Sequence, residues 1–259
     1  MAKYKFSNKL MFALVMQDEE ICAEFIQRLF PGKKVKSITF PNDIQITPEK
    51  TIVTGILSKS VRLDVLFEGE TEVYDIEMQV ETEPELPKRS RYYHTSMDTH
   101  FLKKGKPYKG LKPSYVIFIC TEDPFDRDEA VYFFRSWDVE KGLPIEDLLY
   151  KIILNIACSP EKVPEKLKAF YEYLNDPKKS QASELTRLID ARVRKFNSGD
   201  WRRKYMTFEQ MLNERGRESE AIGFEKGAAQ KQREIAKNLK QAGIPVEVIA
   251  ENTGLSCEE

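Results

Sequence analysis

Val61-Arg62-Leu63-Asp64-Val65-Leu66-Phe67 and Tyr74-Asp75-Ile76-Glu77-Met78-Gln79-Val80 are the stretches on which the fold prediction rests. Both are rich in residues typical of buried strands, and the turn-like Glu68-Gly69-Glu70 separates them. The pattern predicts a β-hairpin. Each run also contains carboxylates, which are costly in a buried strand unless something pairs with them.

The carboxylates fall on one face of this hairpin. Side chains alternate along a strand, so Asp75, Glu77 and Gln79 share a face, and Arg62 lies with Asp64 on the first strand. In an antiparallel pair Asp64 and the face of Asp75, Glu77 and Gln79 can converge. Two converging carboxylates suit a hard cation such as Mg²⁺, which also binds substrate phosphates. The alternative is structural, with Arg62 pairing with Asp64 or Asp75 in a buried ion pair.

Charge is strongly ordered along this part of the chain, although the 259 residues sum to a net charge of only -1. Nine acidic residues and no basic one lie between Leu63 and Leu86: Asp64, Glu68, Glu70, Glu72, Asp75, Glu77, Glu81, Glu83 and Glu85. Eight basic residues against one acid follow: Lys88, Arg89, Arg91, Lys103, Lys104, Lys106, Lys109 and Lys112, with Asp98. An acidic hairpin suited to a cation thus precedes a basic helix suited to phosphates.

The flanking sequence predicts an α/β core. Apolar residues at helical spacing predict helix over the first thirty residues, with a break near Asp18 and an end at Pro31-Gly32, and a second, amphipathic helix over 88–104. Strands are expected at 35–40, 51–53, 114–121 and 131–134, the third in the middle of a sheet, and helices over 144–173.

The region after residue 177 has a different texture. It is charged, mostly helical and interrupted by Gly216, Gly223 and Gly227, which predicts either an exposed helix or a close-packed helix pair in a homodimer. Residues 235–256 resemble the first two helices of a helix-turn-helix, or a capped terminal hairpin. We therefore expect a core over 1–177 and a helical extension over 178–259.

The sequence lacks the features of several other classes of protein. Four separated cysteines and two histidines form no zinc pattern, and GxxxxGK[ST] and GxGxxG motifs are absent. A glycosidase-type carboxylate pair is disfavoured because only Trp137 and Trp201 could supply a sugar-stacking surface. Free cysteines and the lack of a long apolar run predict a cytoplasmic protein that does not enter the membrane.

The chain resembles the PD-(D/E)XK nuclease family transposases, the recombination-promoting (Rpn) nucleases. The resemblance extends over essentially the whole chain. It is carried by Asn8-Lys9-Leu10-Met11-Phe12, Val61-Arg62-Leu63-Asp64-Val65, Tyr74-Asp75-Ile76-Glu77-Met78-Gln79, Pro87-Lys88-Arg89-Ser90-Arg91-Tyr92-Tyr93, Tyr115-Val116-Ile117-Phe118-Ile119-Cys120 and the glycine-spaced tail. It implies a restriction-endonuclease-like core, a central mixed sheet flanked by helices, and a DNA endonuclease that uses Mg²⁺, or Mn²⁺ in its place.

The resemblance also implies roles for individual residues. Asp64 and Glu77 match the metal-binding acids, the Met78 carbonyl is a third candidate ligand, and Gln79 falls where the wider superfamily has a lysine. Gln79 would position water, with Asp75 and Arg62 supporting the ligands, while Arg89, Arg91 and Lys103 are candidates for the DNA backbone.

Two departures from the family bear on activity. Glutamine cannot supply the positive charge of lysine. Many relatives carry an Asp and a Lys in the first helix where this chain has Lys9 and Ala13, so a first-helix acid must be sought among Glu19, Glu20 and Glu24. The leading hypothesis is a metal-dependent DNA endonuclease. The alternative is a catalytically impaired DNA- or partner-binding protein that retains the fold.

Overall fold

The computed structural model describes residues 4–33, 35, 37–40, 50–52, 61–81, 83–198, 236, 237, 239 and 245. The chain divides into two compact units, Met1–Ser198 and Gly199–Glu259. The expected boundary at residue 177 falls inside the first unit. The glycine-spaced segment at 216–227 and nearly all of the hairpin expected at 235–256 lie outside the described residues.

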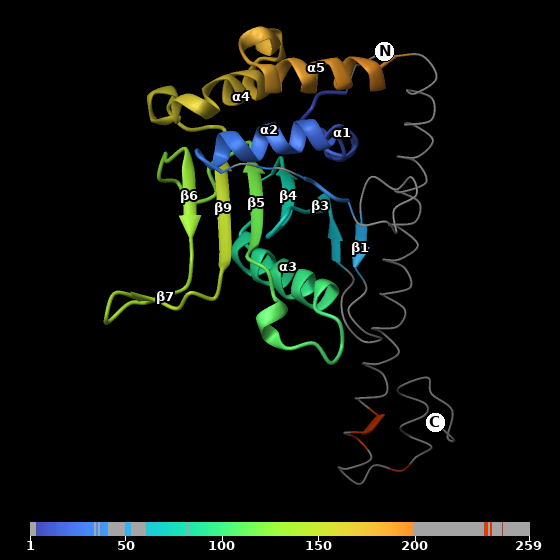
Figure 1. Cartoon of the computed structure of the whole chain (residues 1–259), viewed down its shortest axis with the longest axis vertical. Helices are drawn as coiled ribbons and strands as arrows, with labels where there is room; N and C mark the ends of the chain where they lie inside the picture. The colour runs from blue at the N-terminus through green and yellow to red at the C-terminus, as the bar shows by residue number, and fades with distance from the viewer. Residues whose placement is uncertain are drawn as a thin grey trace. The chain divides into compact units, whose positions relative to one another are not determined.

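A mixed sheet of five strands forms the centre of the first unit, in the order β3-β4-β5-β9-β6 (Figure 1). β4 and β9 run parallel to β5, and the outer strands β3 and β6 run antiparallel to their neighbours. The bounds are β3 Val65–Glu68, β4 Val73–Gln79, β5 Ser114–Cys120, β6 Val131–Phe134 and β9 Leu149–Asn155. The predicted hairpin is confirmed as β3–β4, and β5 is the middle strand, as its nearly all-apolar sequence predicted.

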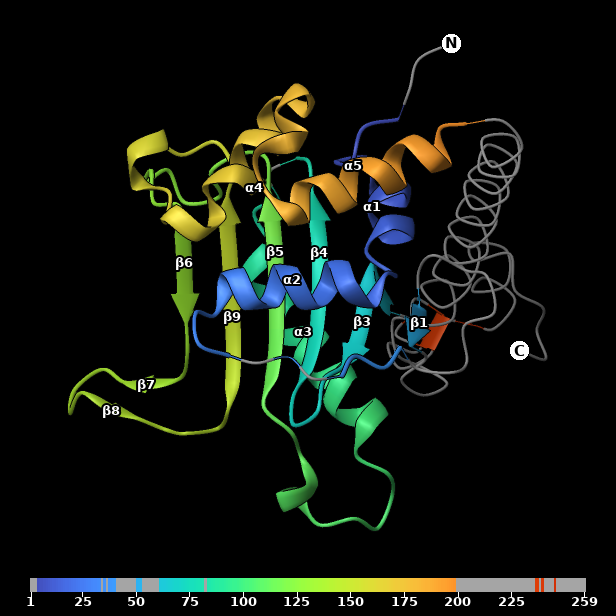
Figure 2. The same cartoon turned by 45° about the horizontal axis from the view of Figure 1, so that its top comes forward.

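Helices cover both faces of the sheet (Figures 1 and 2). α1 and α2 lie on one face, where α4 and α5 pack against them, and α3 lies on the other. The bounds are α1 Lys9–Val15, α2 Glu19–Leu29, α3 Leu86–Phe101, α4 Glu165–Asn175 and α5 Glu184–Phe196. The break predicted near Asp18 is confirmed, because the Asp18 carboxylate caps α2 by accepting the backbone N–H groups of Glu20 and Ile21. A mixed sheet between helical layers confirms the α/β fold class.

The α3 face of the sheet has its own hydrophobic core. Tyr93 and Met97 of α3 pack with Val116 and Phe118 of β5, and all four side chains are buried. The spacing of Tyr93 and Met97 had predicted this face of the helix. Three cysteines of the described part, Cys22, Cys120 and Cys158, are free and buried, as expected, and Cys257 lies outside it.

The expectation of helices over 144–173 was wrong for its first half. Residues 149–155 form β9, and α4 begins only at Glu165. The run Leu149–Asn155 is short and contains two adjacent isoleucines that are buried between β5 and β6, so pairing on both sides decides its conformation. The strand expected at 35–40 is reduced, within its described residues, to one bridge between Thr39 and Glu68.

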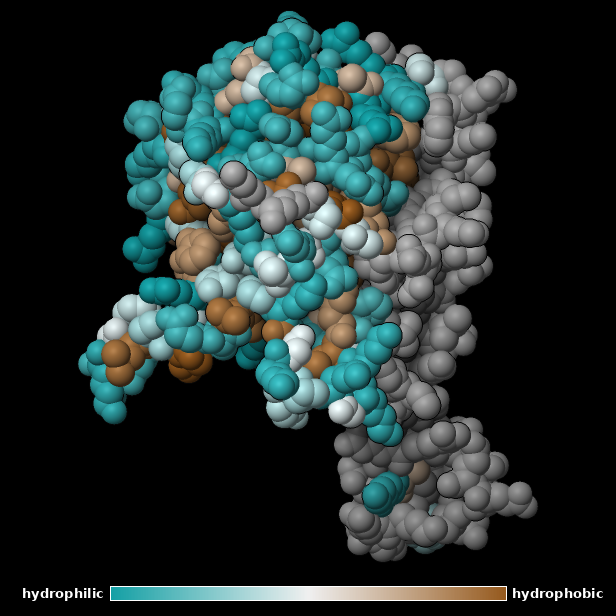
Figure 3. Space-filling model, viewed as in Figure 1, coloured by the Kyte–Doolittle hydropathy of each residue, from teal (hydrophilic) through white to brown (hydrophobic). Residues whose placement is uncertain are grey.

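Two smaller pieces of sheet flank the core. β1 (Lys50–Ile52) pairs with β2 (Val61–Leu63), and β7 (Trp137–Asp138) pairs with β8 (Leu143–Pro144). The β7–β8 ribbon projects from the core (Figures 1 and 2). Hydrophobic residues lie on its surface among hydrophilic ones (Figure 3). Among the described residues, no helix combines the length and apolar character needed to cross a bilayer.

Candidate active site

Asp64 and Glu77 face each other across the β3–β4 hairpin. Asp64 lies at a bend between β2 and β3, and the pairing of Val65 with Ile76 places it opposite Glu77. The Asp64 backbone N–H donates to Glu77 Oε1 at 2.7 Å, and the Met78 backbone N–H donates to Asp64 Oδ2 at 3.1 Å. Each carboxylate is therefore anchored through one oxygen to the opposite strand, and the predicted convergence of the two acids is confirmed.

A third carboxylate, that of Asp75, is buried beside this pair. Asp64, Asp75 and Glu77 are 2, 0 and 1 % exposed. Within the described part of the chain, neither oxygen of Asp75 has a hydrogen-bond partner, and Asp64 Oδ1 has only an ion pair. Unpaired buried carboxylates are costly, so the cluster calls for a proton or a cation.

The pKa values reflect that cost. Burial raises the pKa of the Glu77 carboxyl well above its ordinary value, and the neighbouring charges of Asp75 and Asp64 add to the effect. Burial, followed by the charge of Asp64, likewise raises the pKa of Asp75. The pKa of Asp64 is also raised by burial, although Lys9 and the Met78 backbone N–H act against the shift. All three acids thus resist carrying negative charge together.

Two cationic side chains reach the cluster from different helices. Lys9, the first residue of α1, places its Nζ 3.2 Å from Asp64 Oδ1. Arg89 of α3 places Nη2 3.7 Å from Glu77 Oε2. The second oxygen of each anchored carboxylate therefore faces a cation.

Gln79 and Arg89 are tied together at the end of β4. Arg89 Nη1 donates to Gln79 Oε1 at 2.9 Å, and Gln79 Nε2 donates to the Glu81 carbonyl at 2.5 Å. Arg89 also donates to Tyr93 Oη at 2.9 Å and forms an ion pair with Glu83. Both the oxygen and the nitrogen of the Gln79 amide are thus hydrogen-bonded within the protein. Gln79, Tyr93 and Glu83 together hold the Arg89 guanidinium in place.

Three further residues were predicted for the site from the sequence: Arg91, Lys103 and Arg62. Arg91 is exposed on α3, and Lys103 is exposed just past the end of that helix. Arg62 is in β2, and its side chain is outside the described part.

The first-helix acids do not join the cluster. Glu19 and Glu20 are exposed in the first turn of α2, and Glu24 pairs with Arg28 at 2.9 Å. The residue that α1 contributes is Lys9.

Lys9, Glu83 and Tyr93 were not assigned to the site from the sequence. The spacing of Arg89 and Tyr93 by four residues on a predicted helix was a usable signal for their contact. Nothing in the sequence pairs Lys9 with Asp64, because their contact depends on how α1 docks at the end of the sheet.

The acidic cluster fits a hard divalent cation with few protein ligands. Among the described residues, no group of three or more His, Cys, Asp and Glu side chains is arranged to hold a metal by itself. Mg²⁺ needs only one or two carboxylates, since waters and substrate phosphates complete its shell. Asp64 and Glu77 supply two such carboxylates, and Asp75 adds a buried charge that a cation would offset.

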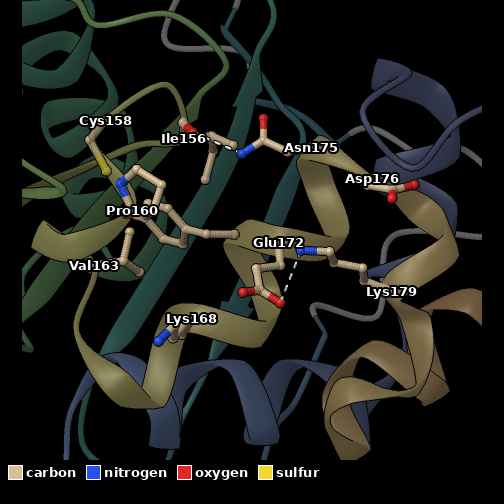
Figure 4. A pocket seen from close by; sticks show the side chains of 10 residues that line it. Ile156, Cys158, Pro160, Val163, Lys168, Glu172, Asn175, Asp176 and Lys179 are labelled. Carbon is tan, nitrogen blue, oxygen red and sulfur yellow. Dashed lines mark hydrogen bonds and ion pairs between the residues drawn. The ribbon is translucent and has the colours of Figure 1, made fainter.

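A pocket lies beside α4, away from the carboxylate cluster (Figure 4). Its volume is about 270 Å³, and Cys158, Tyr171 and Asn175 are among its lining residues. Two interactions join residues of its lining: Asn175 donates to the Ile156 carbonyl at 3.1 Å, and Lys179 pairs with Glu172 at 3.6 Å. It holds no buried cluster of like charges, so the chemistry is better assigned to the hairpin.

The sheet between helical layers, with acids at the carboxyl end of β4, defines a restriction-endonuclease-like fold. The chain belongs to the family described as PD-(D/E)XK nuclease family transposase, whose sequence profile matches residues 2–214. That match spans the whole sheet and both carboxylate-bearing strands. No curated protein and no solved structure matches the chain.

Proposed function

We propose that this chain is a DNA endonuclease that hydrolyses phosphodiester bonds with Mg²⁺, or with Mn²⁺ in its place. The reciprocal anchoring of Asp64 and Glu77 across the hairpin is the observation that carries the proposal. Family membership supports nuclease chemistry. A buried, prearranged pair of carboxylates at the end of a central strand supports a metal-assisted form of it.

Asp64 and Glu77 would hold the cation, with the Met78 carbonyl as a further ligand. Such an ion, when bound, polarises the phosphodiester and lowers the pKa of an attacking water. Asp75 adds negative charge behind the two ligands, and Arg89 holds Glu77 in place. The amide of Gln79 holds Arg89, so we assign it this positioning role in place of the water-orienting role expected from its sequence position.

DNA would reach this site along the basic stretch that follows β4. Arg91 and Lys103 are exposed, as phosphate-binding side chains must be, whereas Arg89 is braced inside the site. Phosphate contacts of this kind position a duplex without reading its sequence. We further propose a cytoplasmic role in DNA recombination or transposition. Because α5 packs within the first unit, we limit the expected pairing of two copies to the part of the helical extension after residue 198.

A non-cleaving DNA-binding protein is the second candidate. The observation in its favour is that Gln79 brings no charge to the site while Lys9 and Arg89 already face the carboxylate oxygens. An internal set of ion pairs of this kind could stabilise the fold without a metal.

Nicking of supercoiled plasmid separates the two candidates. We expect the wild-type protein to nick with Mg²⁺ or Mn²⁺ and not with EDTA, and Asp64→Ala to lose activity by at least about a hundredfold. Glu68→Ala is the matched control, because Glu68 is in the same hairpin but pairs with Lys112 outside the cluster. No nicking with either metal, or equal nicking by Asp64→Ala, would contradict the proposal. A gel shift of DNA without nicking would favour the second candidate.

A further inference from the structure

Lys9 is held at the mouth of the acidic cluster by a well-anchored helix. The Asn8 side chain caps α1 by accepting the Met11 backbone N–H at 3.0 Å, and Leu10, Met11 and Phe12 are buried. The backbone of Lys9 is therefore fixed while its side chain remains 51 % exposed. Its Nζ lies 3.2 Å from Asp64 Oδ1, the carboxylate oxygen that has no other partner within the described part of the chain.

The other polar groups near the carboxylates are less available to a substrate. Gln79 is neutral, and both ends of its amide are bonded to Arg89 and the Glu81 carbonyl. Arg89 bonds Gln79, Tyr93 and Glu83, and its side chain is 23 % exposed. A cation that must meet an incoming phosphate needs exposure and freedom to move, and Lys9 has more of both.

We propose that Lys9 is a catalytic residue, supplying to the phosphate undergoing cleavage the positive charge that Gln79 cannot supply. This inference rests on the proposed nuclease function. Without DNA, the Lys9 ammonium rests on Asp64 Oδ1 and competes there with a divalent cation. With DNA bound, it donates a hydrogen bond to a non-bridging oxygen of the phosphate and stabilises the charge that develops on it.

The step balances without a change at Lys9. A bond forms between the water oxygen and phosphorus, and the ester bond from phosphorus to the leaving oxygen breaks. The water gives up one proton to solvent, and the leaving alkoxide takes one up. Lys9 keeps its proton throughout, so any side chain with a permanent positive charge and similar reach should replace it in part.

Three variants test the proposal: Lys9→Met removes the charge, Lys9→Arg keeps it, and Lys5→Met removes a charge from an exposed lysine earlier in the chain. With protein in excess over plasmid, we expect nicking by Lys9→Met to be slower by about a hundredfold. Lys9→Arg should stay within about tenfold of wild type, and Lys5→Met should match it. Nicking by Lys9→Met within twofold of wild type would overturn the assignment.

Metal binding without DNA gives a second, independent measurement. Calorimetric titration with Mn²⁺ should show about tenfold tighter binding by Lys9→Met than by wild type, because the competing ammonium is gone. Slower nicking together with weaker Mn²⁺ binding would overturn the proposal, since Lys9 would then only be holding Asp64 in place. If the wild-type protein binds Mn²⁺ but nicks no DNA, the nuclease proposal fails. The titration would then still decide whether Lys9 lies at the cation site, and unchanged affinity would reject it.

Discussion

The two faces of β4 are equally buried but chemically opposite. On one face Tyr74 stacks between Phe67 and Tyr115, with ring centroids 5.0 and 5.1 Å apart. Tyr115 in turn stacks on Tyr150 at 4.7 Å, so that aromatic rings run across four strands. Lys33 Nζ approaches this face, 4.7 Å from the Tyr115 ring centroid, and is paired with Glu72 at 2.7 Å. This face stabilises the sheet by ordinary packing.

The other face carries Asp75, Glu77 and Gln79 beneath α3. Asp64 lies beside them, so this site holds three buried carboxylates: Asp64, Asp75 and Glu77. Two cations, Lys9 and Arg89, pair with them. Replacing such groups by apolar residues is often neutral or stabilising, so packing does not explain their presence. One face of β4 therefore stabilises the sheet by packing, whereas the other carries groups that lower stability, as functional sites commonly do.

The largest effect is expected on the aromatic face. Tyr74→Ala should lower the free energy of unfolding by about 3–5 kcal/mol, because it removes a fully buried ring between two others. Tyr74→Phe is the matched control. It should leave stability unchanged or raised, since the Tyr74 hydroxyl has no hydrogen-bond partner among the described residues. Urea unfolding measures both, and a loss below about 1 kcal/mol for Tyr74→Ala would show that the ring stack is not what stabilises this face.

The α3 face should show a stability cost at acid pH that arises from His94. This side chain is fully buried on α3, with Nδ1 2.7 Å from Ser114 Oγ, and burial followed by the charge of Lys151 lowers its pKa to about 3. The unfolded chain takes up the proton first as pH falls through about 6.5, so this contribution to stability is complete above that pH. It is lost progressively as pH falls toward 3.

A non-titrating variant isolates this effect from the nearby carboxylates. Between pH 7 and pH 4, wild type should lose up to about 3 kcal/mol more stability than His94→Gln, measured by urea unfolding in EDTA. Parallel pH profiles for the two proteins would mean that the folded protein protonates His94 at the same pH as the unfolded chain does. The polar groups of this face would then be better solvated than their burial indicates.

The sequence predicted those parts of the fold in which periodicity and burial agree. The alternation in the run 74–80 predicted both faces of β4, and the turn at 68–70 predicted its pairing with β3. The apolar run 115–120 predicted a central strand. Residues 149–155 were misassigned because a short apolar run has no decisive period, and its neighbours in the sheet determine its structure.

Some contacts of the candidate site could likewise be predicted from the sequence, and others could not. Asp64 and Glu77 could be paired from the sequence because a hairpin relates them by register. The contact of Lys9 with Asp64 could not be predicted, because it depends on the docking of a separate helix. The hydrogen bonds of Gln79 to Arg89 and to the Glu81 carbonyl could not be predicted either. A spacing rule gives the position of an amide but not the partners that occupy it.

The smallest effect concerns the same chemical change at two carboxylates of the hairpin. Asp75→Asn should raise the free energy of unfolding of the metal-free protein by about 1 kcal/mol, because asparagine is neutral and avoids the penalty that burial and the charge of Asp64 place on the ionised carboxylate of Asp75. Glu68→Gln should instead lower it by at most about 1 kcal/mol, since Glu68 forms a partly exposed ion pair with Lys112 at 2.7 Å. Changes of opposite sign in the free energy of unfolding, measured with urea in EDTA, would show that the Asp75 carboxylate on the α3 face lowers the stability of the protein. A loss of stability in Asp75→Asn would mean that this carboxylate has a structural partner, and the contrast between the two faces of β4 would no longer point to function.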